Sequence, residues 1–400
     1  EDGEPDFSSP IYAGPEALPV DPLTDVAPGF TEDQRDQPGG FTAEPDVMDT
    51  WATSSLTPQI QSHWGLDPER HAKLFPMDIR PQAHDIIRTW AFSTIVKAWM
   101  HEGEIPWRHV VLSGWILDPD RKKMSKSKGN VVTPDDLLVE WSSDAVRYWA
   151  ARARLGTDTA FDPGVFKVGK RLAMKVFNAS RFVLMQVDAA GGEVPGPEHI
   201  ADPLDLALIE RLRSVTGQAT RYFEAFDYAS ALQVIEERFW QFCDHYLELV
   251  KLRSYSDEDT PGRRSALAAL GLGLNTYLRL LAPFQPFVTE EVWSWSFAGE
   301  GRTKSVHTSA WPTAGEFEAV PRPAVEGTFE AAVEVMTAIR GTKTKAQKSL
   351  RWPVASLEIA GPEAARDSLA PVIDDILRAG NVADGALALS DGEASEGERF

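Results

Sequence analysis

The stretch that decides the fold is Arg121-Lys122-Lys123-Met124-Ser125-Lys126-Ser127-Lys128-Gly129-Asn130, with five positive charges in its first eight residues. An apolar run at 110–117 precedes it, and Thr133-Pro134-Asp135-Asp136 follows it. That second motif predicts a helix start, because threonine can cap, proline suits the first helical position and acids complement the N-terminus. A strand therefore enters a basic loop and a helix leaves it. Lysines, hydroxyls and amides in such a loop favour a polyphosphate ligand, and we call residues 121–130 the lysine loop.

Within the lysine loop, Lys123-Met124-Ser125-Lys126-Ser127 resembles the signature loop of class I aminoacyl-tRNA synthetases. The continuation at 128–132 resembles the subgroup for valine, isoleucine and leucine. The resemblance implies that the loop closes over ATP and stabilises the pyrophosphate that leaves as an aminoacyl-adenylate forms. It implies that Lys126 and Lys123 are catalytic, and that ATP is bound by Lys126, Lys123, Met124, Ser125 and Ser127. The alternative for any lysine cluster is a solvated loop.

A second motif, Asp49-Thr50-Trp51, resembles the version of this segment found in valine-specific members of the subgroup. By that resemblance, Trp51 lines the pocket for the amino-acid side chain, with Ile86 and Asp85 at the end of the following strand. The alternative is that Trp51 and Ile86 are ordinary core residues. The family resemblance also implies that Mg²⁺ accompanies ATP. We predict no dedicated metal site, since the single cysteine excludes a cysteine cluster.

The residues around these motifs predict an α/β arrangement. A strand is expected at 76–80, a helix at 84–101 and an almost wholly apolar strand at 109–117. The apolar strand fits the buried interior of a parallel sheet, and strand, helix, strand is half of a doubly wound, Rossmann-like nucleotide-binding fold. The His-x-Gly-His element of the family is absent from the sequence. The resemblance is therefore to the carboxy-terminal part of the enzyme.

From residue 165 the pattern becomes helical, with helices expected at 165–187, 204–226, 232–249 and 263–281 and a restart at 287–295. This pattern predicts an up-and-down helix bundle, which resembles the anticodon-binding domain of the subgroup. By that resemblance Phe182 presents an aromatic ring to an anticodon base, unless it belongs to the bundle core. The basic residues expected to contact tRNA on the same helix are Arg181, Lys175 and Arg171.

The end of the chain predicts a small α/β appendage. Helices are expected at 326–340 and 363–379, and strands at 356–360 and 386–389. Five basic and no acidic residues lie between 335 and 357. Among them, Lys343 and Lys345 are expected in a basic loop that contacts tRNA phosphate, with a solvated loop as the alternative.

Composition sets the outer limits. The 400 residues carry a formal net charge of −20, and thirteen acidic residues against one basic lie in the first fifty. No run of about 18 apolar residues is present, so we expect no membrane span. A single cysteine rules out a disulfide within the chain and favours a cytoplasmic location. We also expect a monomer. The predicted parts are an irregular acidic segment at 1–45, a catalytic portion at 46–155, a helix-bundle anticodon-binding domain at 156–298 and a small α/β region at 326–400.

The function that the resemblance implies is the ATP-dependent activation of valine and its transfer to tRNA(Val). This chain would supply the lysine loop and the anticodon-binding domain, and we expect it to be inactive alone. One alternative is specificity for isoleucine or leucine, against which the Asp49-Thr50-Trp51 triplet argues. Another is a non-catalytic protein that binds tRNA through the bundle.

Overall fold

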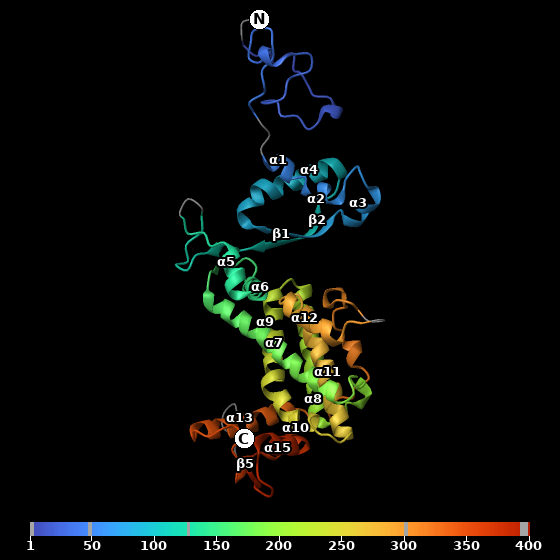
Figure 1. Ribbon diagram of the computed structural model, residues 1–400, viewed down its shortest axis with the longest axis vertical. Coiled ribbons are helices and arrows are strands. Elements are labelled where there is room, and N and C mark those ends of the chain that lie inside the picture. The colour runs from blue at the N-terminus through green and yellow to red at the C-terminus, as the bar shows by residue number, and fades with distance from the viewer. Residues whose placement is uncertain (1–3, 47–49, 126–128, 300–302, 393–398) are drawn as a thin grey trace. The chain divides into compact units, whose positions relative to one another are not determined.

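The computed structural model describes residues 4–46, 50–125, 129–299, 303–392 and 399–400 (Figure 1). The chain forms two compact units, Glu1–Leu112 and Ser113–Phe400. In the first unit, the amino-terminal segment holds two short 3₁₀ turns, η1 (Pro15–Ala17) and η2 (Glu32–Gln34), and a bridge between Arg35 and Phe41.

Residues 50–112 form a small α/β body around β1 and β2, which pair in a two-stranded sheet. The aromatic rings of Trp90 and Trp107 stack at its centre, 6.0 Å apart, with Ala91 beside them. The elements in chain order are α1 (Thr50–Ser54), α2 (Thr57–Ser62), α3 (Pro68–Leu74), β1 (Met77–Ala83), η3 (His84–Ile86), the π-turn η4 (Ile87–Ala91), α4 (Phe92–Glu102) and β2 (Trp107–Ser113).

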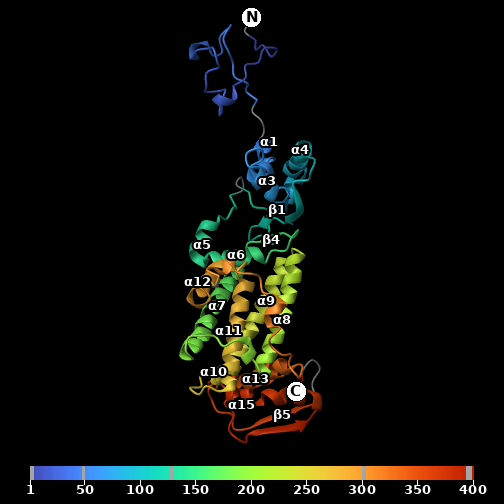
Figure 2. The ribbon, with the colours of Figure 1, turned by 90° about the vertical axis from the view of Figure 1, so that its right-hand side faces the viewer.

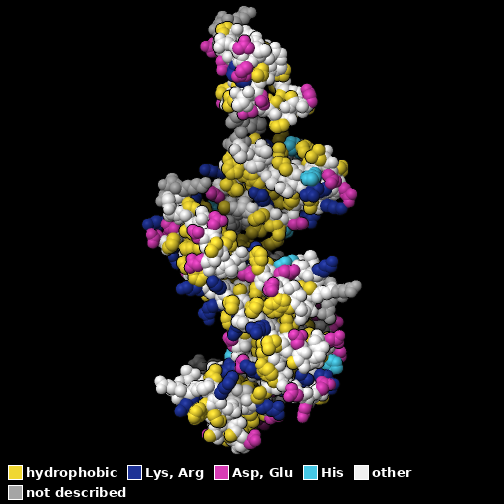
Figure 3. Space-filling view, in the orientation of Figure 1, with side chains coloured by type: hydrophobic (Ala, Val, Ile, Leu, Met, Phe, Trp, Pro, Cys, Tyr) yellow, Lys and Arg dark blue, Asp and Glu magenta, His cyan; other side chains and the backbone are white. Residues whose placement is uncertain are grey.

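The prediction of one buried strand at 109–117 was wrong in extent and in burial. The strand β2 ends at Ser113, and a separate strand β3 (Ile116–Leu117) follows Gly114. A side chain at Gly114 would collide with the carbonyl of Thr157, so the backbone turns at a close approach there. Val110 is 46% exposed, because β1 is the single strand that flanks β2 among the residues that the structure describes. Figure 3 shows further hydrophobic side chains at the surface of this body.

The second unit begins with the lysine loop and its supports. Strand β3 pairs in parallel with β4 (Thr159–Ala160), with Ile116 opposite Thr159. Two helices follow the lysine loop: α5 (Pro134–Trp141), which begins at the predicted helix start, and α6 (Ser143–Ala151). Both pack against the first long helix of the bundle, through Phe166, which is fully buried beside the rings of Trp141 and Trp149.

The predicted helix bundle is present, with long helices side by side (Figures 1 and 2). Its helices begin where the sequence offers caps: the side chains of Asp162, Asp202, Asp227 and Thr260 each accept a hydrogen bond from a first-turn amide. The elements are α7 (Pro163–Ala189), η6 (Pro197–His199), α8 (Pro203–Glu224), α9 (Tyr228–Gln241), the π-turn η7 (Phe242–Tyr246), α10 (Leu247–Ser254), α11 (Pro261–Leu281) and α12 (Pro286–Ser296).

The carboxy-terminal α/β region follows two 3₁₀ turns, η8 (Val306–Thr308) and η9 (Ala314–Phe317). Helix α13 (Thr328–Lys345) runs five residues beyond the predicted end and takes up the start of the basic stretch. The predicted helix at 363–379 is broken at Pro371 into α14 (Glu363–Leu369), η10 (Ala370–Val372) and α15 (Ile373–Gly380). Strands β5 (Leu357–Gly361) and β6 (Leu387–Asp391) pair in parallel. Together with the α/β body and the helix bundle that precede it, this small α/β region confirms the predicted fold class, α/β followed by all-α.

Buried ion pairs hold the carboxy-terminal α/β region against the helix bundle. Arg253 of α10 binds Asp205 of α8 at 2.9 Å and Asp375 of α15 at 2.9 Å, and it lies 3.2 Å from Asp202. Asp205 also accepts hydrogen bonds from Tyr246 and Ser265. Because all of these groups are largely buried, the network makes the appendage part of the same compact unit.

Candidate functional site

The base of the lysine loop is a tight turn. The amide of Asp118 donates to the carbonyl of Lys122, the amide of Arg121 donates back to Asp118, and Leu117 forms a bridge with Lys123. Arg121 takes the left-handed conformation, with φ of 62°. The turn brings the entry to the loop back alongside β3.

Two side chains clamp the entry and the exit of the loop together. The amide nitrogen of Asn130 donates to the carboxylate of Asp118 at 2.8 Å, and its oxygen accepts the amide of Ser125 at 3.0 Å. The Lys122 amide and then the Asn130 amide donate to Asp118, and these bonds lower the pKa of that carboxyl. Sequence reasoning missed this clamp, although an acid before the loop and an asparagine at its end were both visible.

The described part of the loop places three of the predicted residues. The ammonium of Lys123 lies over the ring of Trp115, 3.9 Å from its centroid. Met124 and Ser125 are half-buried in the clamped stem. Lys126 and Ser127 lie outside the described residues. The arrangement brings one predicted cation and the amides of the stem to the same edge of β3.

The loop stem is joined directly to the bundle. The amide of Trp115 donates to Asp158 at 2.8 Å, and β4 then leads through Asp162 into α7. On α6, the buried carboxylate of Asp144 accepts the amides of Phe287 and Val288 at the start of α12. Burial raises the pKa of Asp144, against those amide bonds. The stem and the bundle therefore share one hydrogen-bonded framework.

The three predicted amino-acid pocket residues lie in the first unit. Trp51, 39% exposed, lines a pocket of about 340 Å³ with Ala52, Thr89, Ser93 and Lys97. Ile86 packs against the core of Trp90 and Trp107, and Asp85 is exposed on the turn η3. Trp51 therefore borders a cavity, whereas the lining of that cavity includes neither Ile86 nor Asp85.

The predicted tRNA residues of α7 fall into two groups. Arg171 and Arg181 are exposed. Lys175 forms an ion pair with Asp244 at 2.6 Å and lies over the ring of Trp240. Phe182 is partly buried and meets Tyr255 edge-on, with ring centroids 6.0 Å apart.

The two predicted tRNA lysines of α13 also differ. Lys345 is exposed. Lys343 is 6% exposed, and its ammonium donates to the carbonyls of Leu350 at 2.9 Å and Gly380 at 2.7 Å. Burial lowers the pKa of Lys343. This lysine holds the backbone that follows α13 and is turned away from solvent.

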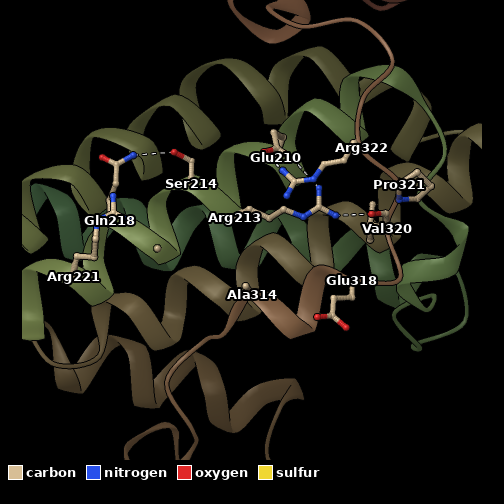
Figure 4. Close-up of a pocket in the computed structure, with 11 residues that line it drawn as sticks. Glu210, Arg213, Ser214, Gln218, Arg221, Ala314, Glu318, Val320, Pro321 and Arg322 are labelled. Carbon is tan, nitrogen blue, oxygen red and sulfur yellow. Dashed lines mark hydrogen bonds and ion pairs between the residues drawn. The ribbon is translucent and has the colours of Figure 1, made fainter.

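A larger pocket, of about 790 Å³, lies between α8 and the segment after η9 (Figure 4). Its central cation, Arg213, binds Glu210 and the carbonyls of Phe317 and Val320, and Arg322 pairs with Glu210. Because these charged side chains and carbonyls bind one another, they pack the segment after η9 onto the helix bundle.

Over the described ranges, no group of three or more histidine, cysteine or carboxylate side chains is placed to hold a metal ion. Nor, within the same ranges, does any helix combine the length and the apolar character needed to cross a bilayer. The free thiol of Cys243 is buried, and burial raises its pKa.

Two family models match the chain. A model described as tRNA synthetases class I (I, L, M and V) matches residues 23–162, and one described as the anticodon-binding domain of tRNA ligase matches residues 205–359. The valine–tRNA ligase of Salinispora tropica is 50% identical over 396 residues, which cover 96% of this chain and 45% of that protein. The chain thus spans about half the length of the curated relatives it matches.

Two solved structures share the fold. The leucyl enzyme in the Agrobacterium radiobacter K84 LeuRS–tRNA–LeuAMS complex matches with a TM-score of 0.58 at 18% identity, over 76% of this chain and 40% of that one. Mycobacterium tuberculosis methionyl-tRNA synthetase, with methionyl-adenylate, matches with a TM-score of 0.54 at 23% identity, over 68% and 56%.

Proposed function

We propose that the chain, which matches models of the class I tRNA synthetases and of their anticodon-binding domain, forms the carboxy-terminal part of a valine–tRNA ligase. The observation that carries the proposal is the lysine loop, clamped by Asp118 and Asn130 and joined through β4 to an anticodon-binding bundle. The Asp49-Thr50-Trp51 triplet and the identity to valine–tRNA ligases favour valine over isoleucine and leucine.

The proposed reaction has two steps. The carboxylate of valine attacks the α-phosphorus of ATP, which gives valyl-adenylate and releases pyrophosphate. A hydroxyl of the terminal ribose of tRNA(Val) then attacks the valyl carbonyl, which forms the ester and releases AMP. Charge builds on the departing pyrophosphate, so cations placed beside it stabilise the transition state more than the ground state. We assign this task to Lys126, with Lys123 assisting after it leaves the ring of Trp115. Bound to ATP, Mg²⁺ would supply neutralisation of phosphate charge; no cluster of side chains among the described residues is placed to hold it independently of the nucleotide.

The remaining predicted residues take supporting roles in this proposal. Met124, Ser125 and Ser127 complete the ATP contact, through backbone amides and hydroxyls. Trp51 lines the valine pocket, which its border on a cavity in the first unit supports. Asp85 and Ile86 shape that pocket only if ligand binding rearranges the turn η3.

For tRNA, we propose that the exposed Arg171, Arg181 and Lys345 contact phosphates directly. Phe182, with Tyr255, offers an aromatic pair to a base at the end of α7. Lys175 and Lys343 act indirectly, since each already holds a partner within the chain. We expect one chain to act on one tRNA, as a cytoplasmic monomer.

The test is ATP–pyrophosphate exchange with valine, in this chain joined to the remainder of the Salinispora tropica relative. Lys126→Ala should slow exchange about 100-fold or more, with valine binding retained, because one transition-state contact is removed. Lys122→Ala is the matched control, since Lys122 is 69% exposed and lies outside the motif. Exchange that survives Lys126→Ala would refute the role of Lys126. Absence of exchange with valine, but tRNA binding by the unmodified chain, would favour a non-catalytic tRNA-binding protein.

A further inference from the structure

The segment that follows α13 presents an unusual set of side chains. Every residue from 344 to 353 is exposed. We call residues 346–352 the tryptophan loop: it holds Lys348, Arg351 and two apolar side chains that point outward, Leu350 at 58% and Trp352 at 53% exposure. Lys345 stands at its start. What sets this loop apart from other exposed tryptophans is the combination of an aromatic face, a neighbouring apolar side chain and several cations, which suits a ligand with both a flat apolar face and negative charge.

The backbone of this loop is held firmly although its side chains are exposed. The buried ammonium of Lys343 binds the carbonyl of Leu350, and the side-chain amide of Asn381 binds the carbonyl of Arg351 at 2.7 Å. Inside the loop, the Trp352 amide donates to the carbonyl of Ser349 at 2.9 Å. The loop is thus tied on one side to α13 and on the other to the end of α15.

The tryptophan itself is restrained. Pro353 follows it, and a residue before proline is confined to extended backbone conformations. The ammonium of Lys348 lies 4.6 Å from the centroid of the Trp352 ring. An aromatic ring that is fixed before binding loses little conformational freedom when a ligand stacks on it.

We propose that the tryptophan loop is a second base-stacking site, in which Trp352 receives an unpaired RNA base while Lys345 and Arg351 contact the flanking phosphates. This proposal rests on the proposed function, because it takes tRNA as the partner. Planar bases stack on aromatic rings whatever their identity, and cations beside the ring match the phosphates on either side of the base. The loop lies within the stretch that matches the anticodon-binding model, and it belongs to the same unit as Phe182 and Tyr255.

In this proposal Lys343 is a positioning residue. Its buried ammonium donates two hydrogen bonds to backbone carbonyls, so Lys343 fixes the shape of the loop and contacts no RNA. A lysine that contacted phosphate would contribute to the salt dependence of binding. The loss of Lys343 should therefore weaken stacking without changing that dependence.

The experiment measures the affinity of the complete 400-residue chain for three RNAs across a range of salt concentrations. The probes are a tRNA(Val) transcript, a short hairpin with an unpaired loop, and the same stem closed by a flexible non-nucleotide linker. Trp352→Ala should weaken binding of the first two about tenfold, leave the third unchanged and keep the salt slope. Trp352→Phe should retain most of the affinity. Lys345→Ala and Arg351→Ala should each lower the slope by about 1.

Two further variants complete the design. Lys343→Met should have the same effect as Trp352→Ala: weaker binding of the tRNA transcript and the hairpin, unchanged binding of the linker-closed stem, and an unchanged salt dependence. Trp99→Ala is the control, because Trp99 is 60% exposed in the first unit and has no place in the proposal. A general loss of folding would weaken binding of all three probes, which separates it from the specific effect.

Several outcomes would overturn the proposal. Equal affinities of Trp352→Ala and the unmodified chain for the hairpin would exclude stacking, and equal losses on hairpin and linker-closed stem would indicate a backbone contact. Trp352-dependent binding to phosphatidylserine vesicles, with RNA binding unaffected, would make the loop a membrane contact. Failure of the unmodified chain to bind tRNA(Val), with Trp352-dependent binding of the hairpin, would count against the proposed function and leave the stacking site standing.

Discussion

In the helix bundle, the side chains at helical spacing are covered: Phe239 is 1% exposed, and its ring meets those of Phe242 and Tyr277. In the α/β body of residues 50–112, α4 has the same kind of apolar spacing, yet Phe92 is 62% and Trp99 60% exposed. Apolar side chains at helical spacing therefore predict a helix in both regions, but they do not tell whether another part of the chain buries them. Since burial of apolar area supplies most of the folding free energy, the two regions should differ strongly in stability.

The largest expected difference is in amide hydrogen exchange of the intact chain. The buried amides of α8, α9 and α11 should exchange at least about 1,000-fold more slowly than those of α4 and β2, because they open only with the bundle core. Mass spectrometry of proteolytic peptides measures both regions in one sample. Equal protection in the two regions would contradict the comparison, and would require that the exposed apolar surface be covered in solution.

A matched pair of substitutions makes the same contrast at single residues. Phe239→Ala removes a buried ring from the bundle and should cost about 3–5 kcal/mol. Phe92→Ala removes an exposed ring from α4 and should change stability by less than about 0.5 kcal/mol. Exchange of the peptides around each site gives the two values. A cost above about 2 kcal/mol for Phe92→Ala would show that α4 has a partner surface.

The same contrast explains which elements could be predicted from the sequence and which could not. The bundle helices were predictable because apolar side chains recur at helical spacing along them. Their exact starts were missed: the caps Asp227 and Thr260 begin α9 at Tyr228 and α11 at Pro261, ahead of the predicted 232 and 263. The strand at 109–117 was not, because apolar composition cannot reveal the close approach at Gly114 or the number of neighbouring strands. The helix at 363–379 was predicted through Pro371, where the missing amide breaks it.

The candidate site also has features that the sequence predicts and features that only the structure reveals. The lysine loop could be located from its residue order, whereas the clamp between Asp118 and Asn130 depends on a turn that brings residues twelve apart together. Lys343 was expected at a surface because lysine usually lies there. Its burial depends on the carbonyl of Gly380, 37 residues away along the chain. Contacts of that kind are set by packing, and a local pattern does not contain them.

The smallest predicted effect concerns a partly buried carboxylate in the helix bundle, that of Asp202 at the start of α8. Burial, followed by the charge of Asp205, raises the pKa of Asp202 to about 6. The folded chain therefore holds a proton on Asp202 that the unfolded chain releases near pH 4, so the contribution of this group to stability falls as the pH rises from 4 to 7. Asp202→Asn keeps a cap oxygen for the Leu204 amide and removes the charge.

At pH 7, Asp202→Asn should stabilise the bundle by about 1–2 kcal/mol relative to the unmodified chain, and the difference should shrink toward zero at pH 4. Urea unfolding at several pH values, followed by exchange of the α8 peptides, measures it. Asp227→Asn is the matched control for exchanging a cap carboxylate for an amide, because Asp227 caps α9 in the same manner through the Ser230 amide. A variant less stable than the unmodified chain at pH 7 would mean that attraction to Arg253 outweighs the cost of burying a third carboxylate beside it.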